Sequence, residues 1–524
     1  WYRVTGDRQA LEVVCRAADC LYDYFILGKR TFASQNWGEC NFAASHMFAL
    51  LYEQTRDPRY LQAAEYIVRT EWTLPYHDFY TNSSLSCNWL ESSLAGTPFC
   101  YSAQKRWESL YTLTTLAVLY RVTGNRDYAD AMELLWWGIV SHDRHNTGSF
   151  GTGEGATGDI YGAGSETCNT VAWMTFSTEY LKLSKNSYVA DELELSYFNA
   201  TLGSQLGDKE FVYMNSSDGQ RVSSQIELAP HSYEGGREMN CCQASGNRGL
   251  SQFTQWGVLN DDRDIYLNYY GQSNVRTLTP KGHPIGIVQQ TDYPKSGSVR
   301  ITLDPGRAER FGLNLRIPVW SSRASVKVNG VPCSGVTPGH YYRLERKWRS
   351  GDVVELDLDM RVHYWVGDGN MAGRTSVYYG PVLLSVAKPS EEAVKYRFTP
   401  ESFDALAFDE RPGHWFYARV ATADGHTVAV EDYAAKPANC GFVGFRPERV
   451  DLAAEFLRDE AELAAGSLFA AGYFAEIFAM VLKSYFLLGD IQFLNIIDHL
   501  LFEPVRVERD AERFDVFADA RFDR

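Results

Sequence analysis

The sequence predicts a multidomain α+β protein, in which a barrel of helical hairpins, an (α/α) barrel, is followed by β-sandwich domains and a short helical C-terminal tail. Three observations support this fold class. The chain has 524 residues, too many for one hydrophobic core, so two to four domains are expected. A helix–turn–helix pattern recurs through the first half. From about residue 264 the hydrophobic period changes to two, which is typical of strands.

The recurring pattern of the first half is a turn between two helices. In each copy a helix ends on an aromatic residue, the chain turns through a polar or glycine-containing step, and a new amphipathic helix begins. An Asp or Asn in the turn is expected to cap the next helix by accepting its free N–H groups. Hairpins that close in a ring make a barrel, and an open solenoid is the alternative. The four copies are residues 1–7, 51–57, 119–125 and 180–186.

The second half alternates apolar and polar residues between clusters of Gly, Pro, Asn and Ser. Residues 298–303, 313–317, 324–328 and 353–358 show this pattern most clearly, and they predict a sandwich of strands. A further β stretch runs from about 376 to 443, and residues 452–502 return to a helical pattern. We therefore divide the chain into a barrel catalytic domain at 1–262, a sandwich at 263–365, a second β-rich domain at 366–445, and a tail of unassigned role at 446–524. The barrel is expected to be incomplete at its N-terminus.

Composition restricts the ligands that the protein can bind. The net charge is −16 and no long Lys/Arg run is present, which argues against a nucleic-acid partner. The 32 tyrosines and 13 tryptophans suit sugar recognition, because such rings stack and hydrogen-bond together. The longest apolar stretch, 469–488, is interrupted by Gly472, Glu476 and Lys483, so no membrane span is expected.

The compartment and the oligomeric state are left open by the sequence. Trp1 stands inside a predicted helix without a signal peptide before it, so a missing N-terminal segment is expected. The protein is expected to be soluble, and either cytoplasmic or secreted. A homo-oligomer is compatible with the sequence.

Three clusters in the helical half carry reactive side chains. They are a glycine-rich loop at 147–155 that contains Glu154, the pair Glu166 and Cys168, and the adjacent pair Cys241 and Cys242. One Glu and three Cys would complete the tetrahedral donor set that Zn²⁺ prefers. The alternative is that the adjacent cysteines are two small buried hydrophobic residues and that Glu-x-Cys arose by chance.

The glycine-rich loop does not have the features of a phosphate-binding loop. It lacks the preceding strand and the Lys-Ser/Thr step that a P-loop requires. Its glycines are instead expected to let the backbone approach a ligand while Glu154 is presented to that ligand. A flexible surface loop with a solvated Glu is the alternative.

The order of these motifs resembles glycoside hydrolase family 127, the β-L-arabinofuranosidase family. The resemblance begins with the loop of Glu154, continues through Glu166-Thr-Cys168 and the segment 211–215, and reaches Cys241-Cys242. The segments 313–320, 328–330 and 379–383 are similar to sandwich signatures of that family. The likeness covers about residues 1–445 in the expected order.

The resemblance implies a retaining glycoside hydrolase that releases a terminal L-arabinofuranose-like sugar from plant-derived glycans. It implies that Cys241 is the nucleophile, that Glu154 is the general acid/base, and that Zn²⁺ is the cofactor, with the ligands Glu166, Cys168, Cys241 and Cys242. A zinc-bound cysteine is held as thiolate, so it can attack an anomeric carbon without a separate base. Glu154 would first protonate the leaving oxygen and then deprotonate water.

Two further residues are candidates for sugar contact, and substrate identity is open. Tyr213 matches a tyrosine of the family, although a core tyrosine is the alternative, and His231 is a sugar contact or a structural histidine. Family members often present a sugar-binding histidine near the position of Trp107, and none is present here. The other hypotheses are a site for another pentose or an acidic deoxy-sugar of pectin, and a non-catalytic carbohydrate-binding protein with a structural zinc.

Overall fold

The structure is a computed structural model in which the chain divides into two units, Trp1–Arg449 and Val450–Arg524. It describes residues 2–35, 38–78, 83–103, 106–162, 164–206, 210–215, 221–222, 232–233, 237–238, 241–388, 390–404, 406–435 and 442–443. All of these belong to the first unit. The predicted helical tail and His231 lie outside the described residues.

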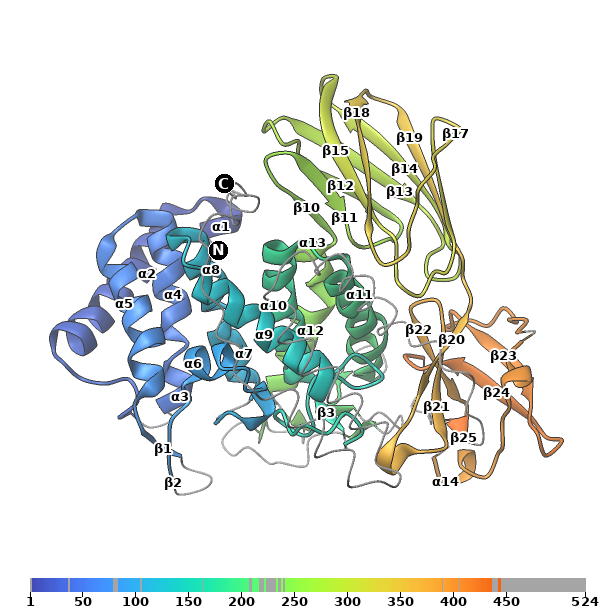
Figure 1. The fold of residues 1–524 in the computed structure, drawn as a ribbon, viewed down its shortest axis with the longest axis horizontal. Helices are drawn as coiled ribbons and strands as arrows, with labels where there is room; N and C mark the ends of the chain where they lie inside the picture. Colours follow the sequence, from blue (N-terminus) through green and yellow to red (C-terminus); the bar gives the residue numbers. More distant parts are fainter. Residues whose placement is uncertain are drawn as a thin grey trace, which may run out of the picture. The chain divides into compact units, whose positions relative to one another are not determined.

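The described residues of the first half of the chain are mainly helical, drawn from blue to green in Figure 1. Short π-helical segments, η1 (Tyr22–Leu27) and η4 (Ser196–Thr201), extend two of the helices. The α-helices are α1 (Tyr2–Thr5), α2 (Arg8–Leu21), α3 (Gly38–Asn41), α4 (Ala44–Thr55), α5 (Pro58–Arg69), α6 (Trp89–Leu94), α7 (Trp107–Leu113), α8 (Thr115–Thr123), α9 (Arg126–His142), α10 (Thr167–Ser184), α11 (Ser187–Leu195), α12 (Cys241–Ser251) and α13 (Phe253–Trp256).

The four predicted turns join consecutive helices with the same local geometry. In each turn one residue takes a left-handed conformation, and these residues are Gly6, Arg56, Gly124 and Lys185. The next residue accepts a hydrogen bond from the backbone N–H two positions later at 3.0 Å, and these capping residues are Asp7, Asp57, Asn125 and Asn186. The prediction that Asp or Asn caps the second helix of each hairpin is therefore confirmed.

Replacing a capping residue should weaken the helix that it begins. Asn125→Ala removes the acceptor for Asp127 N–H at the start of α9, and loss of such a cap destabilises a protein by about 1 kcal/mol. We expect a lower thermal unfolding midpoint for this variant. Glu12→Ala, at an exposed position of α2, is the control and should change stability by less than about 0.5 kcal/mol. Equal midpoints for Asn125→Ala and the control would contradict the capping role.

The described residues between 258 and 443 form three sheets, which confirms the predicted change to β structure. The first has the strand order β10 (Val258–Asn260), β11 (Asp264–Leu267), β15 (Glu309–Arg316) and β18 (Tyr341–Trp348). The second has the order β12 (Ser273–Leu278), β13 (Pro284–Gln290), β14 (Ser298–Pro305), β19 (Asp352–Leu358), β16 (Ala324–Val328) and β17 (Val331–Pro332). Buried and outward residues alternate along β14 and β19, as expected of strands that bury one face.

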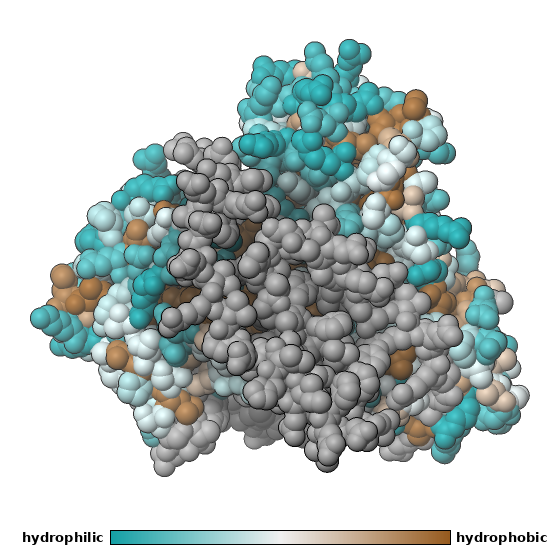
Figure 2. Space-filling view, viewed as in Figure 1, coloured by the Kyte–Doolittle hydropathy of each residue, from teal (hydrophilic) through white to brown (hydrophobic). Residues whose placement is uncertain are grey.

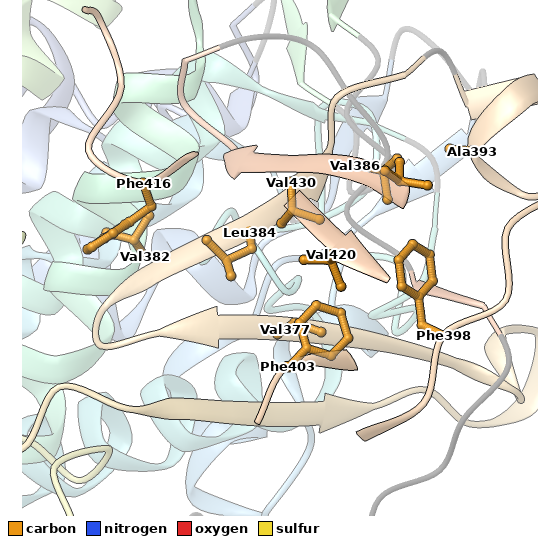
Figure 3. Close-up of a cluster of buried hydrophobic side chains, with 11 residues drawn as sticks. Val377, Val382, Leu384, Val386, Ala393, Phe398, Phe403, Phe416, Val420 and Val430 are labelled. Carbon is orange, nitrogen blue, oxygen red and sulfur yellow. The ribbon is translucent and has the colours of Figure 1, made fainter. Parts of the chain in front are cut away.

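The third sheet has its own apolar core. Its strand order is β20 (Val362–Val366), β21 (Arg374–Tyr379), β22 (Val382–Val386), β24 (Thr427–Asp432) and β23 (Tyr417–Ala421), and β25 (Phe442–Val443) pairs with β21. Side chains from the strands and from the segments that follow β22 fill the space beside this sheet (Figure 3). The described fold is thus a helical region followed by β-sheet-rich regions, and closure into a barrel and packing into sandwiches stay predictions.

A buried ion-pair cluster joins the helical region to the first β region. Arg316, at the end of β15, is fully buried and donates to Asp191 Oδ1 and Glu194 Oε1, both at 2.5 Å. These carboxylates lie on α11, and Tyr293 OH donates to Glu194 Oε1 at 2.6 Å. Burial opposes the charge of Arg316, but the facing carboxylates outweigh that effect and raise the pKa of the guanidinium. The cluster therefore depends on all of its partners being present.

Removing the cation from this cluster should be strongly destabilising. Arg316→Met leaves two carboxylates buried without their guanidinium, a change that typically destabilises by about 3–5 kcal/mol. Arg300→Met is the matched control, because Arg300 pairs with Glu355 on the exposed surface of the second sheet. Exposed pairs contribute at most about 1 kcal/mol. Thermal unfolding of both variants checks this prediction. Equal losses of stability in Arg316→Met and Arg300→Met would show that the buried cluster does not join the two regions.

The surface is predominantly hydrophilic or mixed where Figure 2 shows it in colour. The exposed large hydrophobic residues of the described chain include Val13, Val14, Tyr24 and Leu27 of α2 and η1. Among the described residues, no helix combines the length and the apolar character needed to cross a membrane.

Candidate functional site

A two-residue strand, β3 (Ser165–Glu166), is the centre of the candidate site. On one side it pairs with β6 (Met214–Asn215), with Glu166 opposite Met214. On the other side Ser165 forms a parallel bridge with Gly153, and Glu166 N–H donates to Gly153 O at 3.0 Å. Helix α10 begins directly after Glu166. This short strand therefore places the loop of Glu154, the metal-ligand candidate Cys168 and the segment of Tyr213 beside one another.

Helix α12 brings the adjacent cysteines to the same place. It packs against α10, and two of its glycines permit the close approach. A Cβ at Gly249 would lie 2.9 Å from Val171 Cγ2, and a Cβ at Gly246 would lie 2.2 Å from the ring of Phe211. Any larger residue at either position would push the helix away from its neighbours.

Four candidate ligands converge at this junction. Cys168 Sγ lies 3.5 Å from Cys242 Sγ, and Glu166 Oε1 lies 3.5 Å from Cys241 Sγ and 3.6 Å from Cys242 Sγ. The ligand atoms of all four residues lie within 4.8 Å of one another. Cys168, Cys242 and Glu166 are buried, whereas Cys241 is exposed. The sequence pairs at 166–168 and 241–242, which are far apart along the chain, thus form one cluster.

The chemistry of the cluster fits a bound cation. Burial, followed by the nearby Cys241 and Glu154, raises the pKa of Glu166 to about 9. Glu166 Oε2 is buried and has no hydrogen-bond partner within the part of the chain that the structure describes. Buried carboxylates and thiolates of this kind are stabilised by a metal ion, since it supplies the opposite charge and accepts their lone pairs. Glu166, Cys168, Cys241 and Cys242 could therefore hold a metal ion.

Glu154 lies at the edge of this cluster and is partly exposed. Its Oε2 accepts a hydrogen bond from Arg106 Nη2 at 2.7 Å, and its Oε1 accepts one from Tyr213 OH. The backbone before it is fixed, because Gly153 N–H donates to Gly164 O at 2.8 Å. Gly153 has a φ of 63°, a conformation that glycine adopts without strain. The expectation that the loop presents Glu154 from a glycine-rich backbone fits this geometry.

Tyr213 contacts both parts of the site. Its hydroxyl donates to Glu154, and its backbone oxygen accepts from Thr167 N–H at 3.0 Å and from Cys242 Sγ at 3.9 Å. Burial and the bond to Glu154 raise the pKa of the Tyr213 hydroxyl. The hydroxyl therefore stays protonated and acts as a hydrogen-bond donor at neutral pH.

A wall of aromatic and cationic side chains borders the cluster. Trp107 of α7 packs against Cys168, Tyr213 and Cys242. Its ring meets that of Tyr111 edge-on, with centroids 5.8 Å apart, and the guanidinium of Arg248 on α12 lies 4.7 Å from the Tyr111 ring centroid.

Two arginines of the site were not predicted from the sequence. Arg106 and Arg248 lie in no motif, and isolated arginines are normally solvated. Their part in the site follows from tertiary contacts alone. His231 lies outside the described residues, so its predicted sugar contact stays a prediction.

Comparisons with known proteins identify the family of the chain. Residues 1–255 match the family model described as "Beta-L-arabinofuranosidase, GH127 catalytic domain", and residues 264–360 match "Beta-L-arabinofuranosidase, GH127 middle domain". A curated relative, the non-reducing end β-L-arabinofuranosidase of Bifidobacterium longum subsp. longum, is 26% identical over 429 residues. That alignment covers 73% of this chain, and the chain spans only 62% of the relative's length.

Solved structures share the fold at low sequence identity. One is described as a glycoside hydrolase, with a TM-score of 0.67, 20% identity and coverage of 85% of this chain and 81% of the other. Another is a GH127 β-L-arabinofuranosidase from Geobacillus stearothermophilus T6, with a TM-score of 0.67, 21% identity and coverage of 84% and 77%. The two adjoining family models together match more than half of the residues in the order of the helical and β regions, so this chain belongs to glycoside hydrolase family 127.

Proposed function

We propose that this protein is a retaining glycoside hydrolase that releases a terminal L-arabinofuranose-like sugar from plant-derived glycans. The observation that carries the proposal is the unequal exposure of the four clustered ligands. Cys168, Cys242 and Glu166 are buried, and Cys241 alone among the four is exposed. One thiol thus belongs to the cluster and also faces outward, where a substrate can reach it.

The metal that suits this donor set is Zn²⁺. Three sulfurs and one carboxylate make a four-ligand set of the soft and borderline donors that zinc prefers. Glu166, Cys168, Cys241 and Cys242 would hold it. When bound, the ion would keep Cys241 as thiolate at neutral pH and would make that thiolate a better leaving group.

The remaining steps belong to the side chains of this chain. Cys241 Sγ attacks the anomeric carbon while the bond from that carbon to the leaving oxygen breaks, and Glu154 gives its proton to that oxygen. In the second half-reaction Glu154 takes a proton from water, the water oxygen attacks the anomeric carbon, and the C–S bond breaks to return the Cys241 thiolate. Two inversions at one carbon give net retention. Tyr213 supports both half-reactions by holding Glu154 through its hydroxyl.

Two alternative functions are compatible with the same cluster of four ligands. A closed set of four protein ligands is usually structural, which favours a non-catalytic carbohydrate-binding protein unless Cys241 can react. The same site could also act on another pentose or on an acidic deoxy-sugar of pectin. An aryl-glycoside panel measured with and without a zinc chelator separates these alternatives, because only the enzyme hypothesis requires turnover that the chelator abolishes.

Substitutions of the two glutamates should affect metal content and turnover differently. We expect about one zinc per chain. Glu166→Gln and Cys168→Ser should lower the metal content, because each removes a ligand, whereas Glu154→Gln should keep the metal and lose most turnover. Elemental analysis and kcat measurements check this. Cys333→Ser, in the loop after β17, is the control and should change neither quantity. Exchanged outcomes for the two glutamates would reverse their proposed roles.

Cys241 should react selectively with a substrate-like electrophile. A furanoside that carries an electrophilic trap should label Cys241 and leave Cys242 unlabelled, because Cys242 is buried and only the exposed thiolate reaches the anomeric carbon. Peptide mass spectrometry identifies the labelled residue. Cys20→Ser, which removes an exposed cysteine on α2, is the control and should leave the labelling of Cys241 unchanged. Cys241→Ser should abolish turnover. If turnover survives, the thiol mechanism is wrong and a two-carboxylate mechanism with Glu154 and Glu166 takes its place.

A further inference from the structure

The carboxylate of Glu154 is held by two donors from distant parts of the chain. Arg106 Nη2 donates to Oε2 at 2.7 Å, and Tyr213 OH donates to Oε1. Each carboxylate oxygen therefore accepts one hydrogen bond. The terminal torsion of a glutamate is otherwise broad, so these two contacts decide where the oxygens point.

The backbone contacts near Glu154 do not fix its side chain. Gly153 O accepts hydrogen bonds from Glu166 N–H and from Asn169 Nδ2, both at 3.0 Å. These bonds place the Cα of Glu154 beside the cysteine cluster. The side chain of Glu154 is 34% exposed, and Arg106 and Tyr213 hold its two carboxylate oxygens.

Arg106 is itself well anchored. Its backbone forms an antiparallel bridge with Gly155, the residue after Glu154. Its side chain is 20% exposed, and its Nε lies 3.6 Å from Glu108 Oε2. The guanidinium thus lies between two carboxylates, with Glu108 on α7 holding it from one side and Glu154 receiving its hydrogen bond on the other. A planar guanidinium can serve both partners at once, because its N–H groups point in fixed directions.

We propose that Arg106 is a positioning residue that directs the Glu154 carboxyl group toward the leaving-group oxygen. This inference rests on the proposed role of Glu154 as general acid/base. A proton donor must lie within hydrogen-bond reach of the oxygen that it protonates, and a displacement of about 1 Å reduces the rate about 10²-fold. Arg106 exchanges no proton and forms no bond with the substrate. It acts only through the orientation of Glu154.

The test is the dependence of kcat/KM on the leaving group in a series of furanosides. A strongly acidic phenol departs with little proton donation, whereas an alkyl alcohol requires a well-placed acid. Arg106→Met should therefore lower kcat/KM for the alkyl furanoside about 10²-fold and change the value for the most acidic phenol much less. Its metal content should equal that of the wild type. Arg106→Lys should recover part of the loss, because the ammonium group retains a donor for Oε2.

Two further variants make the result decisive. Arg126→Met removes an exposed arginine of α9 that pairs with Asp130, and it should keep the wild-type leaving-group dependence. Glu154→Gln is the reference for complete loss of the acid. If Glu154→Gln steepens the dependence and Arg106→Met lowers all substrates equally, Arg106 is only structural and the proposed function stands. If Glu154→Gln leaves the dependence unchanged, Glu154 is not the acid, and the role of Arg106 is overturned with it.

Discussion

The pairing of β3 with its two neighbours is the constraint on which the site depends. Strand β3 has only two residues, yet it holds Gly153 on one side and Met214–Asn215 on the other, and α10 continues directly from it. A ladder this short has few hydrogen bonds, so its stability must come from the surrounding packing. That packing includes Tyr433, whose hydroxyl donates to Asn215 from the end of the third sheet. The β-rich part of the chain therefore supports a site whose reactive residues all lie in the helical part.

The connection between the helical and β regions contains buried polar contacts beside aromatic ones such as that of Phe198 with Trp415. Arg316 meets Asp191 and Glu194 across the junction with the first β region. At the junction with the third sheet, Asn199 donates from its Nδ2 to Pro381 O at 3.0 Å, and its Oδ1 accepts from Leu383 N–H at 2.8 Å. Buried polar contacts of this kind are favourable only when every partner is present. They therefore require the elements to keep the placement in which each donor meets its acceptor.

The metal-ligand candidates and the proposed acid/base of the site differ in their exposure to solvent. Cys168, Cys242 and Glu166 are buried and suit a cation, while Cys241 is exposed and the partly exposed Glu154 accepts hydrogen bonds from Arg106 and Tyr213. Burial of three ligands shields a bound cation from solvent, whereas proton exchange with a leaving group or with water needs access to it. The single backbone segment from 151 to 168 supplies residues to both environments. That proximity is what would allow an exposed thiol and a partly exposed carboxylate to act on one substrate.

Much of this organisation could be predicted from the sequence, because it depends on local rules. The capping residues Asp7, Asp57, Asn125 and Asn186 follow from the chemistry of helix N-termini, and the strands follow from alternation of apolar and polar residues. The ligand candidates Glu166, Cys168, Cys241 and Cys242 were identified by residue type and by resemblance to the family. Only the tertiary structure placed Cys241 outward and Cys242 inward, and it alone brought Arg106 to Glu154 across 48 residues. These contacts depend on how α7, α10 and α12 pack, and no local pattern of residues encodes a partner that distant in the chain.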